Sequence, residues 1–333
     1  MGFYDLRLPE IREQQAELAR EAGVEGFCYW HYWMGKGKML LERPFVEVLE
    51  SGKPDFPFCL GWANGDWNNH TWTKRETFVK DEVIVAQHYS SEDYKEHFLF
   101  ALKAFKDKRY IRIDDKPLFY IHNPQGVPDV KYFIELWNQL ARENGLKGVF
   151  FVGRSNNAAY WHIDENGVKK RDLHPRLDIA GQMYKNVLDM GFDAVNSRGM
   201  DRAEMIVGGR WKTMIAKSVF VIFKDTRLRR YRQEDIINNY FVKEDANDNV
   251  FPTLFPNWDR SPRQGRQAAV CYDSTPEVFE KDIQLALKLL DKKPDNRKIL
   301  FLQAWNEWGE GNHVEPDLKY GHGYLNVLKK YFG

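Results

Sequence analysis

Apolar runs typical of buried β-strands recur along this chain, with helical segments between them. Seven such runs begin near residues 24, 56, 117, 148, 192, 250 and 298. Strand and helix alternate at intervals of roughly 30 to 45 residues, which is the pattern of parallel βαβ units. The expected fold class is therefore α/β, as a (β/α)8 TIM barrel. An eighth strand should precede the opening helix, so either this chain lacks the first strand or the barrel is open between the strands near residues 24 and 298.

Helix boundaries follow from terminal signals. The first helix is expected over residues 8–22, with Pro9 in its first turn, and the clearest one follows Thr275 as N-cap. Another is expected from residue 38 to Gly52. Residues 156–176 are polar and predict a long loop over the barrel mouth. Residues 211–224 fit helix or strand equally well, because their periodicity does not decide. We expect one domain over residues 1–333.

Polar and aromatic residues follow several of the strands, at the point where each strand ends. In a barrel these exits meet at the C-terminal ends of the strands, where active sites lie. Large rings cover the apolar face of a sugar, and amides and carboxylates bind its hydroxyls, although such rings also stack on each other. The exits predict a sugar site formed by His31, Tyr32, Trp33, Trp62, Asn64, Asp66, Trp67, Trp258, Asp259, Trp305, Asn306 and Trp308.

Two carboxylates stand out in the stretch after the last strand. Glu307 and Glu310 lie three residues apart among tryptophans, an asparagine and glycines. Residues i and i+3 of a turn project to similar sides, so both can face one sugar. Carboxylates this close raise one another's proton affinity, which helps to keep one protonated as an acid. The alternative is that both are ordinary surface charges.

Composition excludes several classes of protein. Lys and Arg number 49 against 48 Asp and Glu, so no net charge attracts nucleic acid or an anionic membrane. No run of 18 apolar residues predicts a membrane span, and the start lacks the apolar core of a signal peptide. Cys28, Cys59 and Cys271 are widely spaced and predict buried free thiols, so we expect a cytoplasmic protein. We expect no metal and no cofactor, since metal-ligand spacings and nucleotide-binding loops are missing from the sequence.

Weaker motifs have simpler explanations. Asp114-Asp115 is more simply a turn than a metal-binding pair, and the basic run at residues 227–232 is more simply a surface arm than a phosphate or sulfate site. Asn69 begins a glycosylation sequon without secretory context.

Five stretches together resemble a known family. They are GFYDLRLPEIREQQAELAREAGVEGFCYWHYW, KPDFPFCLGWANGDW, RYIRIDDKPLFYI, FPNWDRSPR and QAWNEWGEGNHVEPD. The chain resembles the WbsX-type family over nearly its whole length. That family is usually described as glycosyltransferase or lipopolysaccharide-biosynthesis proteins, and it is similar to family 99 glycoside hydrolases. Family members usually carry a segment before the Tyr-Asp-Leu motif, with the first barrel strand, which this sequence does not include.

The resemblance implies a chemistry. Family 99 hydrolases are retaining endo-acting α-mannosidases and α-mannanases that need no metal, and their Glu-x-x-Glu pair falls on Glu307 and Glu310. Glu310 would be the general acid/base. Glu307 would deprotonate the sugar's own 2-hydroxyl, which closes onto the anomeric carbon as a 1,2-anhydro sugar.

Three functions follow as hypotheses, each with an oligo- or polysaccharide as partner. The first is a retaining hydrolase of α-linked, mannose-type glycans, tied to cell-surface polysaccharide (O-antigen or capsule) metabolism. The second is a transferase or transglycosylase on the same pocket, in lipopolysaccharide biosynthesis. The third is a non-catalytic glycan-binding barrel. We find no nucleotide-sugar motif, which weighs against a nucleotide-dependent transferase.

Overall fold

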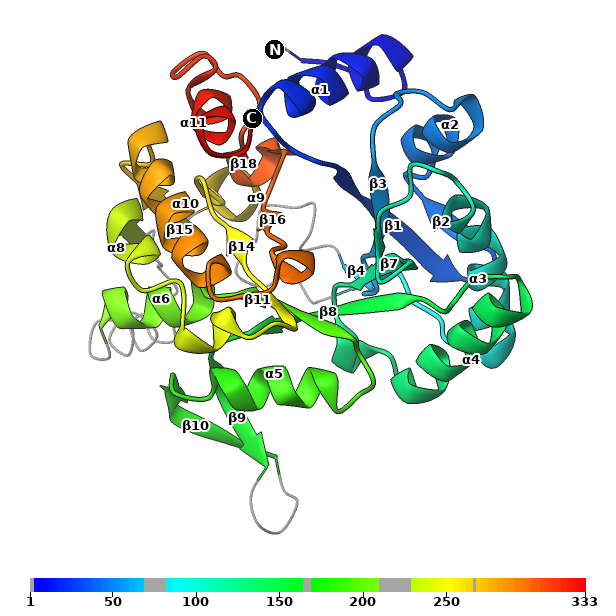
Figure 1. Cartoon of the computed structure of the whole chain (residues 1–333). Helices are drawn as coiled ribbons and strands as arrows, with labels where there is room; N and C mark the ends of the chain where they lie inside the picture. The colour runs from blue at the N-terminus through cyan, green and yellow to red at the C-terminus, as the bar shows by residue number, and fades with distance from the viewer. Residues whose placement is uncertain (1–2, 69–81, 164–168, 210–228, 266–267) are drawn as a thin grey trace.

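A computed structural model describes residues 3–68, 82–163, 169–209, 229–265 and 268–333. Parallel strands form its centre, and a ring of helices surrounds them (Figure 1). Each of the seven expected runs forms a parallel strand, which confirms the α/β class. In order, these strands are β1 (Phe27–Gly35), β3 (Phe58–Trp62), β7 (Lys116–Ile121), β8 (Phe150–Asn156), β11 (Ala194–Arg198), β13 (Val250–Phe251) with its continuation β14 (Thr253–Leu254), and β16 (Phe301–Leu302).

The helices alternate with these strands. Thr275 caps one of them as predicted, since its side chain accepts a hydrogen bond from the Val278 amide at 3.3 Å. The helices are α1 (Pro9–Glu21), α2 (Arg43–Ser51), α3 (Ser91–Phe105), α4 (Val130–Glu143), α5 (Ala180–Leu188), α6 (Met200–Gly208), α8 (Gln233–Ile237), α9 (Ser261–Gln264), α10 (Pro276–Leu290) and α11 (Gly323–Phe332).

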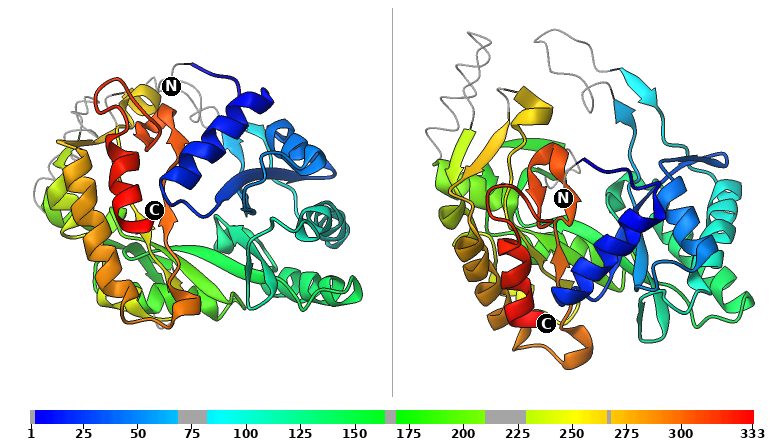
Figure 2. Two further views of the ribbon diagram at one scale, coloured as in Figure 1. Left: turned by 45° about the horizontal axis from the view of Figure 1, so that its top comes forward. Right: turned by 90° about the horizontal axis from the view of Figure 1, so that it is seen from above.

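Short antiparallel or accessory strands lie beside the barrel strands and near their ends. They are β2 (Lys38–Leu40), β4 (Trp67–Asn68), β5 (Val83–Val85), β6 (Arg112–Ile113), β9 (Ala159–Ile163), β10 (Lys169–Arg176), β12 (Arg229–Arg232), β15 (Ala269–Tyr272), β17 (Asn306–Glu307) and β18 (Asn312–His313). In the right-hand view of Figure 2, α9, the β17–β18 segment and the β4–β5 pair lie at one end of the barrel. The parallel strands finish at this end, which we call the barrel mouth.

Side chains alternate between the two faces of each strand, and the outer face holds the main core. Phe119 and Phe151 pair in register on β7 and β8 and pack against Trp137 and Phe133 of α4. All four of these rings are fully buried. Burying an aromatic side chain of this size contributes about 2 to 3 kcal/mol. This layer holds α3 and α4 against the sheet and so fixes the strand ends that form the mouth.

The barrel wall has a seam between β1 and β16. Strand pairing runs from β16 through β14, β13, β11, β8, β7 and β3 to β1, and among the described residues β1 and β16 do not pair with each other. Side chains fill the seam instead: the rings of Phe27 and Trp305 meet at 5.3 Å, next to Ala16, Ala19 and Phe56. Helices α1 and α11 pack side by side across the outside (Figure 2, left).

Several local predictions were wrong. The loop expected over residues 156–176 contains two strands, because β9 and β10 pair antiparallel with Lys169 opposite Ile163. The helix expected from residue 38 begins only at Arg43, because β2 pairs with β1 first. Cys28 is exposed, whereas Cys59 and Cys271 are buried free thiols as expected.

Two predictions concern residues that the structure does not describe. Residues 211–224 and the sequon at residues 69–71 lie outside the described residues. Part of the basic run forms β12, where Arg229 pairs with Glu204 at 2.9 Å. Within the described ranges, no helix is both long enough and apolar enough to cross a membrane.

Candidate active site

The two glutamates lie on a tight turn at the barrel mouth. β17 and β18 pair antiparallel, with Glu307 opposite Asn312, and the short 3-10 helix η6 (Trp308–Glu310) connects them. Gly311 closes this turn with φ +52°, and a Cβ there would lie 2.9 Å from the Cβ of Asp259. Only glycine combines this backbone conformation with so close an approach. The glycine therefore allows the turn to dock on the strand exit that follows β14.

One arginine bonds both carboxylates. Arg263 of α9 lies 3.0 Å (Nη1) from Glu310 Oε1 and 3.2 Å (Nη2) from Glu307 Oε1. Arg260 adds a second cation, with its Nε 3.4 Å from Glu310 Oε2. A guanidinium presents a rigid fork of donors, so it can hold two carboxylates at a fixed separation. The Glu307–Glu310 pair is thus positioned from α9 as well as from its own turn.

Electrostatics distinguish Glu307 from an ordinary surface carboxylate. Burial raises the pKa of Glu307, the charge of Arg263 lowers it, and the charge of Glu310 raises it, for a net upward shift. Burial and the charge of Glu307 raise the pKa of Tyr32, so the Tyr32 hydroxyl belongs to the same neighbourhood. The ring of Tyr32 also meets the ring of Trp67 at 5.3 Å. Tyr32 and Trp67 therefore contact each other at the mouth, near Glu307.

His31, Trp33 and Trp62 do not face the mouth. They point to the outer face of the sheet, where the Trp33 ring stacks on His97 of α3 at 4.8 Å. His31 Nε2 lies 2.9 Å from His97 Nε2, and Trp62 is fully buried with its Nε1 donating to the Trp33 carbonyl at 2.9 Å. Consecutive residues of a strand face opposite sides, so Tyr32 can face the mouth only if both its neighbours face away. These three side chains belong to the core, which corrects the prediction.

Asn64 and Asp66 support the neighbouring loops. The Asn64 side chain donates to the Asn123 carbonyl at 2.7 Å and accepts from the Asn123 amide at 2.8 Å, and Asn64 is 1% exposed. Asp66 is exposed and accepts from the Gln87 amide at 2.7 Å. Asn64 therefore ties the exits of β3 and β7 together, and little of its amide is left for a substrate.

Trp258 and Asp259 lie where the segment after β14 meets the glutamate turn. The Asp259 amide donates to the Glu310 carbonyl at 2.9 Å, and its side chain accepts from the Ser261 amide at 2.8 Å. Trp258 is only 3% exposed and packs between two arginines, with the guanidinium carbon of Arg198 4.3 Å and that of Arg260 5.4 Å from its ring. Asp259 thus positions the turn, and Trp258 organises cations beside it.

Trp305, Asn306 and Trp308 surround a third carboxylate. The indole nitrogens of Trp305 and Trp308 donate to Glu315 at 3.1 and 2.7 Å. Asn306 donates to the Tyr4 hydroxyl at 3.2 Å. The Trp308 ring remains 39% exposed and stacks on His313 at 3.6 Å. Of the three predicted residues, only Trp308 offers a large exposed surface to a sugar.

A profile of known protein families matches residues 1–328 under the description "Glycosyltransferase WbsX". The chain belongs to the WbsX glycosyltransferase family. This confirms the resemblance noted in the sequence and agrees with a carbohydrate-active enzyme, with hydrolysis and transfer both open.

Curated relatives of this WbsX-family chain are bacterial. It is 26% identical over 332 residues to a protein named WxcX from Xanthomonas campestris pv. campestris (strain B100), which is described as uncharacterized. The match covers 99% of this chain but 42% of that relative, so the WbsX-family chain spans less than half of its length.

Solved structures share the fold. A glycoside hydrolase-like protein superposes with a TM-score of 0.63 at 15% identity, covering 99% of this chain and 88% of the other. The GH99 endo-alpha-mannosidase from Bacteroides thetaiotaomicron superposes with a TM-score of 0.56 at 13% identity, covering 99% and 80%. The barrel fold of the WbsX-family chain is therefore that of glycoside hydrolases.

Sequence reasoning missed several residues of the WbsX-family site. Trp30 is 46% exposed and meets His122 at 5.1 Å on the inner face of the sheet. Arg154, Arg198 and Arg263 were also missed, although Arg154 lies two residues before the end of β8 and Arg198 ends β11. Extending the strand-exit rule from aromatic and acidic residues to arginine would have found these two. Among the described residues, no three metal-ligating side chains gather in one place.

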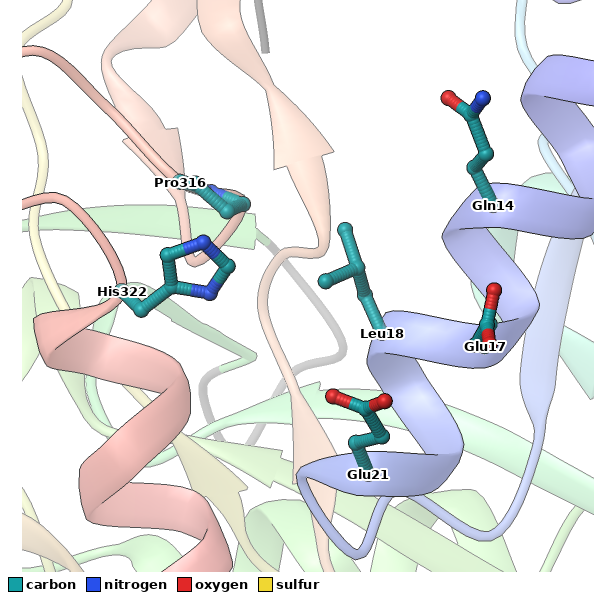
Figure 3. A pocket seen from close by; sticks show the side chains of 6 residues that line it. All are labelled: Gln14, Glu17, Leu18, Glu21, Pro316 and His322. Carbon is teal, nitrogen blue, oxygen red and sulfur yellow. The ribbon is translucent and has the colours of Figure 1, made fainter.

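A separate groove lies on the outer flank of the WbsX-family barrel. It has a volume of about 350 Å³. Figure 3 shows Leu18 on α1 facing Pro316 and His322 across it, with Glu17 and Glu21 on the α1 side. None of the residues that line it comes from the glutamate turn or from a strand exit. We therefore place the candidate active site at the mouth.

Proposed function

We propose that this WbsX-family chain acts on α-linked, mannose-type glycans with retention of configuration, using Glu307 and Glu310, in cell-surface polysaccharide metabolism. The observation that carries this proposal is the bonding of both carboxylates by Arg263 at the barrel mouth. Two carboxylates held on one turn can serve one sugar, and exposed rings at Trp30 and Trp308 offer apolar surfaces for it.

The proposed first step moves two protons. Glu307 takes the proton of the 2-hydroxyl, and the freed oxygen attacks the anomeric carbon of the same sugar. The bond to the leaving oxygen breaks as Glu310 donates its proton to that oxygen. A 1,2-anhydro sugar and a shortened glycan result, with Glu307 protonated and Glu310 ionised.

The second step returns both protons. Glu310 takes a proton from water or from an acceptor hydroxyl, whose oxygen attacks the anomeric carbon. The epoxide bond opens, and Glu307 gives its proton back to the 2-oxygen. Two inversions at the anomeric carbon give net retention. The choice between water and an acceptor separates a hydrolase from a transferase.

The environment of Glu307 suits a general base. Burial raises the pKa of Glu307, and a higher proton affinity makes a stronger base. Protonation of Glu310 weakens its ion pair with Arg263. We therefore expect Arg263 to keep its bond to Glu307 while Glu310 carries the catalytic proton.

Transfer is the second candidate, and the family description as glycosyltransferase favours it. The same two carboxylates would activate an acceptor hydroxyl in place of water. Products longer than the substrate, formed when an acceptor sugar is in excess, would identify transfer. Free reducing ends without longer products would identify hydrolysis.

The test uses α-mannan-type oligosaccharides with the wild type, Glu307→Gln and Glu310→Gln, and chromatographic analysis of the products. Loss of an acid or base typically slows turnover by about 10² to 10⁴-fold. We also expect Glu310→Gln to recover on an aryl glycoside whose leaving group needs no protonation, whereas Glu307→Gln stays inactive. Exposed Glu50 provides a matched control, Glu50→Gln, with wild-type rates.

Two results would contradict the proposal. Unchanged turnover of the natural glycan by Glu310→Gln would remove it as the acid. Glycan binding by the wild type without any turnover would favour a non-catalytic barrel.

A further inference from the structure

Three arginines gather at the mouth beside the glutamate pair, and we call Arg154, Arg198 and Arg260 the arginine cluster. Arg154 lies on β8, in register with Asn196 of β11, and Arg198 lies two residues further along β11. Residues two apart on a strand share a face, so Arg154 and Arg198 project to the same side of the sheet. Arg260 follows β14 and shares the ring of Trp258 with Arg198.

Among the described residues, two members of the cluster, Arg154 and Arg198, lack the acidic partners that such cations usually have. Within the described residues, neither Arg154 nor Arg198 forms an ion pair. Arg154 instead donates to His122 Nε2 at 2.8 Å. Burial and the charges of Arg154 and Arg198 lower the pKa of His122 to about 3, so this imidazole is a neutral acceptor. Burial and the neighbouring charge of Arg154 lower the pKa of Arg198.

Unpartnered donors point to a missing acceptor. Arg198 Nε and Trp258 Nε1 are both buried and have no hydrogen-bond partner in the part of the chain that the structure describes, and Trp258 as a whole is 3% exposed. Among the nearby carboxylates, Glu204 is bonded by Arg229 at 2.9 Å, and exposed Asp201 acts on Arg198 through its charge but forms no ion pair with it within the described residues. Buried cations and donors without acceptors are costly to a fold, and a bound anion removes that cost.

The position of the cluster relates it to the chemistry. Arg260 Nε lies 3.4 Å from Glu310 Oε2. The guanidinium of Arg260 also contacts the ring of Trp258, and this ring contacts Arg198. Trp258 and Arg260 therefore connect Arg198 to the proposed acid, Glu310. Neutral mannose-type sugars give these donors no charged acceptor.

We propose that Arg154 and Arg198 bind a negatively charged group of the substrate, a carboxylate, sulfate or phosphate oxygen set, next to the bond that reacts. This inference rests on the proposed function and narrows its substrate class. Arginine suits it, because its planar fork matches the geometry of carboxylates and phosphates. The group has two possible sources: an acidic substituent on the glycan, or the diphosphate of an activated sugar donor.

The test measures binding by isothermal titration at low ionic strength. The probes are inorganic phosphate, methyl α-glucuronide, methyl α-glucoside and a nucleoside diphosphate. The variant is Arg154→Met with Arg198→Met, since methionine keeps packing area beside Trp258 and removes the charge. The matched control is Arg142→Met on the exposed side of α4.

We expect the wild type and Arg142→Met to bind phosphate alike, and the double variant to bind it at least about tenfold more weakly. Binding of the glucuronide but not the glucoside identifies an acidic glycan as the source. A nucleoside diphosphate that binds more tightly than phosphate, with no glucuronide binding, identifies a donor diphosphate.

Wild type that binds neither phosphate nor glucuronide would overturn the proposal, as would equal binding by the double variant. The melting temperature separates a folding role from a binding role: we expect it unchanged or higher in the double variant, and a marked fall with intact binding would overturn the assignment. Binding is read without turnover. If no glycan is turned over, the proposed function is contradicted, but the anion site is still tested by the binding measurements.

Discussion

Glu315 is the residue whose replacement tests the architecture of the seam most directly. Its carboxylate is fully buried and accepts four hydrogen bonds. Oε2 receives the Tyr4 hydroxyl at 2.8 Å and the Trp308 indole at 2.7 Å. Oε1 receives the Gln15 amide at 2.6 Å and the Trp305 indole at 3.1 Å. One side chain thus connects the N-terminal segment and α1 to the glutamate turn, across the gap between β1 and β16.

The loss of unfolding free energy expected for Glu315→Gln follows from these four hydrogen bonds. An amide keeps one acceptor oxygen and replaces the other with an NH2 group, so two of the four donors lose their acceptor. Each buried donor left unsatisfied costs about 1 to 3 kcal/mol. The neutral amide also avoids the cost of burying a charge, which offsets part of the loss. We therefore expect the free energy of unfolding to fall by roughly 3 kcal/mol.

Equilibrium unfolding in urea, followed by tryptophan fluorescence, measures this change. Glu13→Gln on the exposed face of α1 is the matched control and should stay within about 0.5 kcal/mol of wild type. A Glu315→Gln protein as stable as the control would refute the reasoning. In that case the four bonds would have no net energetic value, and the seam would depend on apolar packing alone.

Two further predictions concern titration. Arg263→Met removes the charge that lowers the pKa of Glu307, so this pKa should rise further. The acidic limb of the pH profile of kcat/KM should then move to higher pH, and it should move less in Arg263→Lys. An acidic limb that does not move would show that Glu307 is not the base. Burial raises the pKa of Asp282 to about 8, so the folded protein keeps this carboxyl protonated at pH values where the unfolded chain has lost the proton. The free energy of unfolding should therefore fall as the pH rises from about 4 towards 8. Asp282→Asn can still accept from the Phe255 amide, so unfolding titrations should show this variant gaining stability relative to wild type over that range, and parallel curves would contradict the assignment.

The sequence was sufficient for the strands because each one is an apolar run between clear breaks. It also placed Glu307 and Glu310 correctly after the last strand, since β16 ends at Leu302 and the turn follows within a few residues. Thr275 shows the same dependence on local signals, because a cap is decided by the residues next to it. Features of this kind need no knowledge of the tertiary fold.

The direction in which side chains face was harder to predict. His31, Tyr32 and Trp33 follow one another in β1, and alternation sends His31 and Trp33 away from the mouth. A strand buried on both faces carries apolar residues on each, so the sequence gives no cue to which face is the outer one. Arg263 shows a second limit. Its contact with Glu307 joins residues 44 positions apart, and only the docking of α9 on the turn brings them together.

Partners, more than position in the sequence, decide what the three carboxylates of the last segment can do. Glu315 has both oxygens filled by protein donors and none of its surface exposed, so it cannot meet a substrate. The Glu310 side chain is 14% exposed and lies against Arg260 and Arg263. The Glu307 side chain is 39% exposed, and Arg263 and the backbone of Gly309 and Glu310 bond its carboxylate. The buried carboxylate therefore supports the turn, and the two that reach the surface are the ones proposed for chemistry.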